Sequence, residues 1–351
     1  MSSAAEIRTP ITQHRSPAWS TDRAAAPESA IVFGGSGFIG SRMVRLLHQR
    51  GVERITVADV AAPRDLGFEV GFHYVDVREP IAIEGSWDVA YNFSAVHRTP
   101  GHPDQEYFET NVAGAINVTN FCRDRGIETI VFTSSIAIYG PKEDLLTEQS
   151  EPQPTSAYGK SKLLAEDVHR TWYADDPRRR LVVVRPAVIF GDGENGNFDR
   201  LRGALRKRRF AYPGRTDTIK ACGWVEELVR SMEWVRNGDD TDVTYNFAYP
   251  ERATIEDIAT TISSVDGTAK PLGRIPLTPM LGAASVFELA GRLGVRTGIN
   301  RARIHKLVRS TNVFPGYLVE HDYPFGTDVR SGIQGWLSET RRASAPAALT
   351  R

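Results

Sequence analysis

The chain has 351 residues, 41% hydrophobic and 25% charged, which is enough for two domains or one enlarged α/β domain. Its 43 basic and 43 acidic residues cancel, which argues against a nucleic-acid-binding protein. No apolar run reaches the ~18 residues that span a bilayer. The two cysteines, Cys122 and Cys222, are too few for a disulfide framework and fit a reducing cytoplasm. The eight histidines are scattered and do not form a metal-binding cluster with them.

Both ends of the chain are expected to lie outside the folded body. Residues 1–28 carry charges and prolines but no apolar stretch of the kind found in a secretory signal, which predicts a mobile N-terminal tail. Residues 341–351, "RRASAPAALTR", predict a second tail. The folded part therefore extends from about residue 29 to residue 340.

Short apolar runs alternate with helical patterns over residues 29–192. The helical patterns span residues 38–51, 105–126 and 157–173. The predicted strands lie at 30–35, 54–60, 72–77, 87–95, 128–140 and 180–191. Strands that alternate with helices predict right-handed βαβ units. The fold class expected is therefore α/β, with a Rossmann-type doubly wound parallel sheet.

The pattern loosens over residues 193–340, which predict mainly a smaller C-terminal α/β subdomain for the substrate, with some strands free to return to the main sheet. Helices are expected at 195–210, 225–238 and 254–265, and a strand at 243–249. The apolar stretch 277–295 favours a packed helix or a dimer contact, and a helix on a membrane surface is the alternative.

The turn "GGSGFIG" after the first strand has the spacing of a dinucleotide-binding loop. Gly35, Gly37 and Gly40 give G-x-G-x-x-G, and Gly34 offers an overlapping register. Glycines let the backbone approach a pyrophosphate, which the following helix N-terminus can hold. Asp59 ends the next strand, nineteen residues after Gly40, where a carboxylate binds an adenosine ribose and favours NAD over NADP.

Hydroxyl groups and a Tyr/Lys pair are predicted to meet at the end of the 128–140 strand. Ser134 and Ser135 stand at its carboxyl end, where an open α/β sheet presents its chemistry. Tyr158 and Lys162 are four residues apart and share one face of the next helix. An ammonium beside a phenol favours the phenolate, so Lys162 is expected to lower the pKa of Tyr158.

These segments together resemble the extended short-chain dehydrogenase/reductase family, in its NAD-dependent nucleotide-sugar epimerase/dehydratase branch, and within it the UDP-sugar 4-epimerases. The likeness covers residues 30–192. It rests on "GGSGFIG", "VDV", "NFSA", "TNVAGAINV", "VFTSSIAIYG", "YGKSK" and "VRPAVIFG". The resemblance implies a catalytic set of Tyr158 as acid/base, Lys162 at the nicotinamide ribose and Ser135 at the substrate oxygen, with Ser134 as the alternative.

The resemblance also implies how the two ligands bind. Cofactor-binding residues would be Gly34, Gly37, Phe38, Ile39, Asp59, Asp76, Val77, Phe93, Ser94, Ala95, Tyr158, Lys162 and Pro186. Substrate-binding residues would be Ser134, Ser135, Asn197, Phe198 and Arg215. Relatives carry a His-Val pattern where this chain has Trp224-Val225, so its substrate pocket is expected to differ.

The activity implied by the resemblance is an NAD-dependent 4-epimerisation of a nucleotide sugar through a transient 4-keto intermediate. Dehydration is not expected, because Thr133 is followed by two serines and not by the Asp-Glu pair of dehydratases. The alternatives are an NAD(P)-dependent reductase or dehydrogenase of a keto-sugar, lipid-linked sugar or sterol-like hydroxyl, and a non-catalytic NAD-sensing protein. A homodimer is implied by resemblance. The sequence leaves the sugar, the nucleotide and the permanence of NAD binding open.

Overall fold

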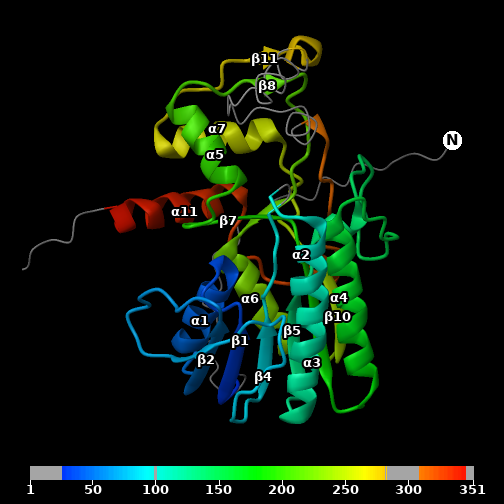
Figure 1. The fold of residues 1–351 in the computed structure, drawn as a ribbon. Helices are drawn as coiled ribbons and strands as arrows, with labels where there is room; N and C mark the ends of the chain where they lie inside the picture. Colours follow the sequence, from blue (N-terminus) through cyan, green and yellow to red (C-terminus); the bar gives the residue numbers. More distant parts are fainter. Residues whose placement is uncertain (1–25, 99–100, 281, 283–307, 345–351) are drawn as a thin grey trace, which may run out of the picture.

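A seven-stranded parallel sheet forms the centre of the computed structural model, which describes residues 26–98, 101–280, 282 and 308–344. The strand order is β10-β6-β5-β4-β1-β2-β3, and Figure 1 shows the sheet in the half of the molecule opposite β8 and β11. The bounds are β1 Ser29–Phe33, β2 Arg54–Asp59, β3 Gly71–Tyr74, β4 Val89–Asn92, β5 Thr129–Thr133, β6 Arg180–Pro186 and β10 Asp242–Phe247.

Helices cover both faces of this sheet because its central strands are apolar on both sides. One face packs against α1 and α6, and the other against α3 and α4. The bounds are α1 Phe38–Gln49, α2 Asp104–Phe108, α3 Gly114–Asp124, α4 Ala157–Ala174 and α6 Val225–Arg236. The predicted doubly wound α/β fold is thus confirmed.

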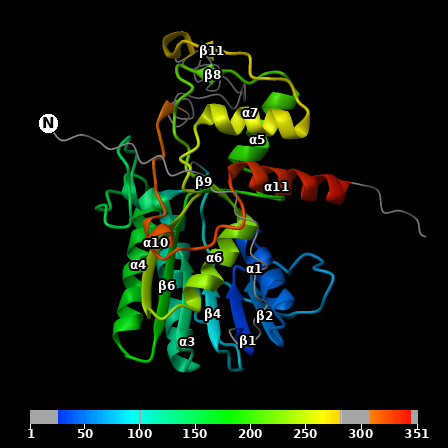
Figure 2. The same ribbon diagram turned by 180° about the vertical axis from the view of Figure 1, so that it is seen from behind.

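A smaller layer lies beyond the carboxyl ends of the strands and has a core of its own. Phe190, Phe198 and Trp336 pack there with the apolar face of α7. Figures 1 and 2 show α5, α7 and α11 stacked above the sheet. The elements are β7 Val188–Phe190, α5 Asn197–Arg206, β8 Tyr212–Pro213, β9 Cys222–Trp224, α7 Ile255–Asp266, β11 Arg274–Ile275 and α11 Val329–Ser344. The short helix α10 Gly316–Glu320 packs instead on β10 of the main sheet.

Local signals explain how several elements begin and end. Thr254 caps α7 and forms a capping box with Asp257. The helix stops at Gly267, which adopts a left-handed conformation with φ 66°. Gly126, at φ 65°, ends the long helical region that begins at α2. These residues are the turn and cap types that the sequence pattern uses to mark helix boundaries.

The structure corrects several of the expected elements. The serine strand ends at Thr133, and Ile136–Tyr139 forms a 3₁₀ turn. Its neighbour ends at Pro186, because Val188–Phe190 leaves the main sheet to pair with β9. The last helix continues to Ser344, beyond residue 340. Residues 105–126 are helical, with a π-helical turn at Glu109–Ala113.

Some expectations fall where the structure gives no description. Residues 1–25 and 345–351 lie outside the described residues, as do 281 and 283–295 of the apolar stretch 277–295. Among the described helices, none is long and apolar enough to cross a bilayer.

Candidate active site

The candidate site lies where the carboxyl ends of β1, β4, β5 and β6 meet. The glycine turn follows β1, Phe93–Ala95 follows β4, Ser135 follows β5, and Pro186 ends β6. The parallel pairings β1–β4, β4–β5 and β5–β6 bring these strand ends to one edge of the sheet. This edge is where open α/β sheets bind their ligands.

Two glycines of the turn are required by close backbone contacts. Gly34 has φ 73°, and a Cβ there would lie 2.8 Å from the Phe93 carbonyl carbon and the Ser94 nitrogen. A Cβ on Gly40 would lie 2.2 Å from the Gly34 oxygen. The turn therefore packs directly against the segment after β4, and no larger residue fits either position without a backbone shift.

The glycine turn fits the pyrophosphate of a dinucleotide. Gly37 is the N-cap of α1, and no side chain accepts a hydrogen bond from the start of this helix. The first backbone N–H groups, including those of Phe38 and Ile39, lack acceptors within the helix and attract an anion. A glycine N-cap leaves the approach to these groups open.

The two acidic residues predicted to contact the adenosine end of a dinucleotide already have partners within the chain. The Asp59 carboxylate ends β2 and accepts hydrogen bonds from the backbone N–H groups of Ser36, at 3.0 Å, and Ala61, at 3.1 Å. The Asp76 carboxylate pairs with the Arg78 guanidinium, which lowers its pKa. Val77 is buried beside Asp76 and would contact any Cβ placed on Gly114.

Helix α4 carries the predicted Tyr/Lys pair. Ser156 caps the helix, because its side chain accepts a hydrogen bond from the Gly159 N–H at 3.1 Å. The Lys162 ammonium donates to the Thr133 carbonyl oxygen at 2.8 Å, which ties α4 to the end of β5. The Ser135 side chain lies beside Tyr158 and influences its pKa, so all three predicted catalytic groups meet at one place.

The expected lowering of the Tyr158 pKa is wrong for this arrangement. Burial raises the pKa of Tyr158, and the neighbouring Ser135 hydroxyl only partly opposes this. Burial also lowers the pKa of Lys162 to about 7, against a smaller opposite effect of Glu166. Desolvation disfavours the charged form of each group, and the Lys162 ammonium is directed at Thr133.

Ser134 and Ser135 face different surroundings. Ser134 is 3% exposed, and its buried hydroxyl oxygen has no hydrogen-bond partner among the described residues. Ser135 is half-buried and accepts a hydrogen bond from the Ala137 N–H while facing Tyr158. This placement favours Ser135 over Ser134 as the hydroxyl available to a substrate.

Sequence reasoning missed a buried ion pair that joins α4 to β6. The Glu166 carboxylate accepts two hydrogen bonds from the Arg185 guanidinium, at 3.0 and 2.8 Å. Burial would raise the pKa of Glu166, but Arg185 holds it below its ordinary value. Arg185 also donates to the Tyr139 hydroxyl at 2.8 Å. An acid one helical turn after Lys162 was the only signal in the sequence for this pair.

A second missed residue is Asn111, which joins the loop after β4 to the catalytic helix. Its side chain accepts from the Val96 N–H at 2.9 Å and donates to the Val96 oxygen at 3.1 Å. It also donates to the Ser161 hydroxyl at 2.8 Å, and Ser161 donates to the Tyr158 carbonyl oxygen. Asn111 lies in the π-helical turn, a conformation frequent at functional sites.

The predicted substrate-phosphate residues lie in the smaller layer and differ in availability. Asn197 is exposed at the first position of α5. Phe198 is 5% exposed and stacks on Phe190, so its side chain belongs to the core. Arg215 forms ion pairs with Asp217, at 2.7 Å, and with Glu143, at 3.4 Å. To bind a phosphate, Arg215 would have to contact it while still paired with these acids, or break these ion pairs.

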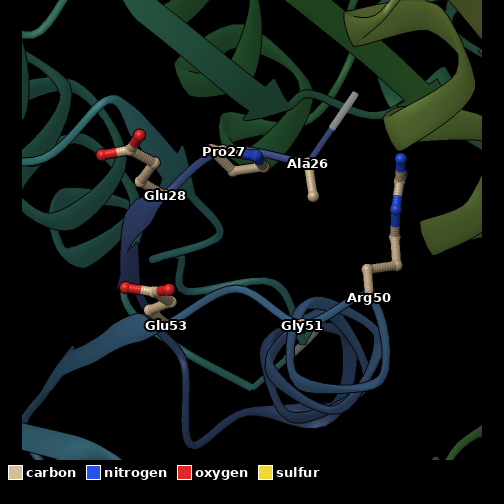
Figure 3. Close-up of a pocket in the computed structure, with 6 residues that line it drawn as sticks. All are labelled: Ala26, Pro27, Glu28, Arg50, Gly51 and Glu53. Atoms are coloured by element: carbon tan, nitrogen blue, oxygen red, sulfur yellow. The ribbon is translucent and has the colours of Figure 1, made fainter. Parts of the chain in front are cut away.

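One pocket elsewhere in the molecule does not compete with this site. It has a volume of about 420 Å³ and lies at the amino end of β1, opposite the catalytic edge (Figure 3). Its lining is Ala26, Pro27, Glu28, Arg50, Gly51 and Glu53. The Arg50 side chain is paired with Glu233 at 3.0 Å. In the described part of the chain, no group of three or more His, Cys, Asp or Glu could hold a metal ion.

Comparison with protein families places this site in a known context. Residues 30–246 match the model of the NAD dependent epimerase/dehydratase family. The chain belongs to this family. The match covers the glycine turn, Ser135, Tyr158 and Lys162. NAD is therefore the cofactor, and the geometry of the glycine turn fits its pyrophosphate.

Two curated relatives differ in how much of the chain they match. The N-acetyl-α-D-glucosaminyl-diphospho-ditrans,octacis-undecaprenol 4-epimerase of Escherichia coli O157:H7 is 24% identical over 81% of this chain and 86% of its own. UDP-glucose 4-epimerase 2 of Oryza sativa subsp. japonica is 31% identical over 45% of this chain and 43% of its own. The chain thus spans less than half the length of the rice relative.

Solved structures share the fold over nearly the whole chain. MoeE5 in complex with UDP-glucuronic acid and NAD superposes with a TM-score of 0.68 at 20% identity, over 90% of this chain and 99% of that one. The UDP-glucose 4-epimerase of Thermus thermophilus, in complex with NAD, gives 0.68 at 21% identity, over 90% and 99%. These similarities establish a shared fold.

Proposed function

We propose that the protein is an NAD-dependent 4-epimerase of a diphosphate-linked sugar, with a nucleotide sugar as the first candidate substrate. One observation carries this proposal: Ser135, Tyr158 and Lys162 meet at the carboxyl end of β5, beside a glycine turn that fits a dinucleotide. Family membership and the names of the relatives in both comparisons support the same activity.

The chain's own residues would hold the substrate and move its proton. Tyr158 takes the proton from the sugar hydroxyl at C4 and returns it at the end of the cycle. Ser135 donates a hydrogen bond to the same oxygen while it becomes a ketone and then a hydroxyl again. Lys162 holds the nicotinamide ribose and, when charged, favours the Tyr158 phenolate. Reversible hydride transfer is the chemistry that NAD supplies when bound.

The proposal assigns roles to the remaining predicted cofactor and substrate residues. Asp59 receives the adenosine ribose, and Asn197 and Arg215 face the diphosphate of the substrate. Lys220 is a further cation beside Glu143 and Arg215, and burial lowers its pKa to about 8. The remaining cofactor contacts come from Gly34, Gly37, Phe38, Ile39, Asp76, Val77, Phe93, Ser94, Ala95 and Pro186.

The test separates an epimerase from a dehydrogenase. The purified full chain is denatured and assayed for released NAD(H), and the native protein is incubated with UDP-, GDP- and dTDP-sugars. We expect isomerised sugar without net formation of NADH. Stoichiometric NADH formation, with an empty site in the purified protein, would instead establish a dehydrogenase or reductase. Retained NAD with no conversion of any sugar would contradict both readings.

A lipid-linked diphosphosugar is the second candidate substrate. The Escherichia coli relative is named for such a substrate, and its match covers most of both chains. The same assay therefore includes N-acetylglucosamine diphosphate on a short polyprenyl chain. Conversion of this compound and not of the UDP-sugars would assign the substrate to the lipid-linked class.

Two further features of the proposal concern assembly and location. Ile116 on α3 and Leu164 on α4 are 44% and 46% exposed on neighbouring helices, which supports a homodimer through this face. Cys122 and Cys222 are free and buried, which supports a reducing, cytoplasmic location.

A further inference from the structure

The end of the smaller layer carries a run of cations with no acidic partner among the described residues. Arg206, Lys207, Arg208 and Arg209 follow one another at the end of α5, and all four are exposed. None of them forms an ion pair with a residue that the structure describes. The nearby Asp266 carboxylate is already bound by Arg202, at 2.9 and 3.0 Å. Four charges are therefore left facing solvent.

Exposed apolar side chains lie directly beside these cations. The Leu272 N–H donates to the Phe210 oxygen at 2.9 Å, which places Leu272 next to the end of the cation run. Leu272 is 67% exposed, and Ile275 on β11 is 41% exposed. A single exposed apolar side chain is unremarkable, but here two of them stand in a ribbon bordered mainly by positive charge.

The ribbon forms one end of the molecule. β8 and β11 pair in parallel, with Pro213 opposite Ile275, and Figures 1 and 2 both show them at the end farthest from the main sheet. Lys270 and Arg274 add two exposed cations to the ribbon. The acids near it are Asp217, close to Arg274, Glu256 and Asp257, close to Tyr212, and Asp266, close to Arg206. Six cations thus face four acids, of which Asp266 is already bound by Arg202.

We propose that this surface docks the protein on an anionic phospholipid bilayer. We call it the tip surface, and it consists of Arg206, Lys207, Arg208, Arg209, Lys270, Leu272, Arg274 and Ile275. Anionic lipids attract clustered Lys and Arg side chains at short range, and exposed apolar side chains can enter the headgroup region. A nucleic-acid backbone would use the cations alone, so Leu272 and Ile275 favour the membrane.

The geometry gives the docking a consequence for the proposed function. α5 has ten residues, so its two ends lie about 15 Å apart at 1.5 Å per residue. The cations follow its carboxyl end, and Asn197 stands at its amino end. Docking would hold the proposed diphosphate-binding end of α5 close to the bilayer, which suits a lipid-linked substrate. Only this step rests on the proposed function.

Vesicle binding by the full chain tests the proposal without any assay of activity. Co-sedimentation is measured with vesicles of phosphatidylcholine alone and of phosphatidylcholine with phosphatidylglycerol, over a series of salt concentrations. We expect binding only with the anionic lipid, and weaker binding as salt rises. Equal binding to both vesicles, or none to either, would overturn the proposal.

Variants assign the binding to the tip surface. Replacement of all four cations at 206–209 with glutamine should weaken binding by about tenfold or more, and Leu272→Asp should weaken it further. The control replaces four exposed cations elsewhere, Arg54, Lys160, Arg309 and Arg330, with glutamine, and it should bind as the wild type does. Thermal melting confirms that each variant is folded.

Two results would contradict this assignment. Equal losses in the 206–209 variant and in the control would show attraction by net charge alone. Tighter binding of an RNA or DNA duplex than of the anionic vesicles, lost in the 206–209 variant, would assign the tip surface to nucleic acid.

Discussion

Tyr158 and Lys162 are both buried in a way that opposes their charged forms. Burial raises the pKa of Tyr158 and lowers that of Lys162 to about 7. At neutral pH the phenol keeps its proton in this arrangement, and the amine can hold or release one. Tyr158 can act as the proposed base only when a charged Lys162 favours the phenolate. The pair is therefore set for proton exchange with a substrate and is not a permanently charged couple. Both pKa shifts exist only in the folded protein, because burial of the two side chains causes them.

Tyr158→Phe should abolish turnover and leave NAD bound, because only the hydroxyl that exchanges the proton is removed. The measurement pairs sugar isomerisation with NAD released on denaturation. Tyr107→Phe is the matched control: its ring lies 6.0 Å from that of Tyr158, and its hydroxyl donates to the Arg98 carbonyl oxygen. Turnover in the control should persist. Undiminished turnover in Tyr158→Phe would exclude this tyrosine as the base.

Lys162→Met should inactivate the protein yet stabilise it at neutral pH. A lysine with a lowered folded pKa costs stability below its ordinary pKa of 10.5, and that cost is relieved as pH rises from about 7 toward 10.5. Each pKa unit corresponds to ~1.4 kcal/mol, and loss of the hydrogen bond to Thr133 offsets part of the gain. We expect a gain of about 2 kcal/mol at pH 7, shrinking at pH 10.

Denaturant unfolding of wild type and variant at both pH values measures this effect. The prediction is contradicted if the variant is less stable than the wild type at pH 7 and by the same margin at pH 10. That result would show that the buried ammonium does not destabilise the folded protein.

At the scale of single elements, α4 and α6 each carry a buried carboxylate bound to arginine. Glu166 pairs with Arg185 at 2.8 Å, and Glu233 pairs with Arg236 at 2.8 Å. Glu166→Gln and Glu233→Gln should each cost about 3 kcal/mol of stability, since each leaves an arginine without its partner. Only Glu166 raises the pKa of Lys162. Glu166→Gln should therefore lower that pKa further.

The pH dependence of NAD affinity separates the two variants. Calorimetric titration from pH 6 to 9 should show the alkaline loss of affinity at lower pH in Glu166→Gln than in the wild type. The profile of Glu233→Gln should match the wild type. If both variants shift the profile equally, the effect comes from lost stability. The other titratable groups near Lys162 are Tyr158, His169 and His97.

The glycine turn offers a test at the junction of β1 and α1. Gly34→Ala should destabilise the protein by about 2 kcal/mol and weaken NAD binding, because its φ is 73° and its Cβ would meet the backbone at 2.8 Å. Gly203→Ala is the matched control, since nothing lies within 4 Å of a Cβ there, inside α5. It should stabilise the protein slightly. Calorimetry and NAD titration measure both effects.

What sequence reasoning could predict depends on how local each signal is. The capping box at Thr254 and the glycine turn rest on residues close together in the chain, and the structure has both. The separation of β7 from β6 depends instead on pairing with β9, more than thirty residues later. The π-helical turn at Glu109–Ala113 has no propensity signal, so the role of Asn111 could not be read from spacing.

The same limit applies to charges. Arg215 follows a turn and looks free in the sequence, but Glu143 reaches it from 72 residues away. The burial that determines the pKa of Lys162 comes from the packing of α4 on β5. The spacing in the sequence predicts that Lys162 lies beside Tyr158, but it does not predict how deeply the two side chains are buried.

At the scale of the whole molecule, α3 and α4 leave two large apolar side chains exposed on adjacent helices. Leu164→Asp should convert the proposed homodimer to a monomer, because a carboxylate would be buried in the contact. Light scattering after size exclusion measures the mass. Val319→Asp, at a 41% exposed position on α10, is the control and should leave the assembly unchanged. A monomeric wild type would exclude this interface.

The edge strand β10 of the main sheet comes late in the sequence, after the first elements of the smaller layer. Residues 188–224 belong to that layer, and α6 and β10 return to the sheet. The elements α7, β11 and α11 lie in the layer again, whereas α10, between β11 and α11 in the chain, packs on β10. The smaller layer is therefore built from several separate segments inserted in one scaffold. A chimera made by a single cut at residue 192 would exchange β10, the outer neighbour of β6, together with the layer. Exchange of the layer alone between relatives requires separate grafts on both sides of α6 and β10.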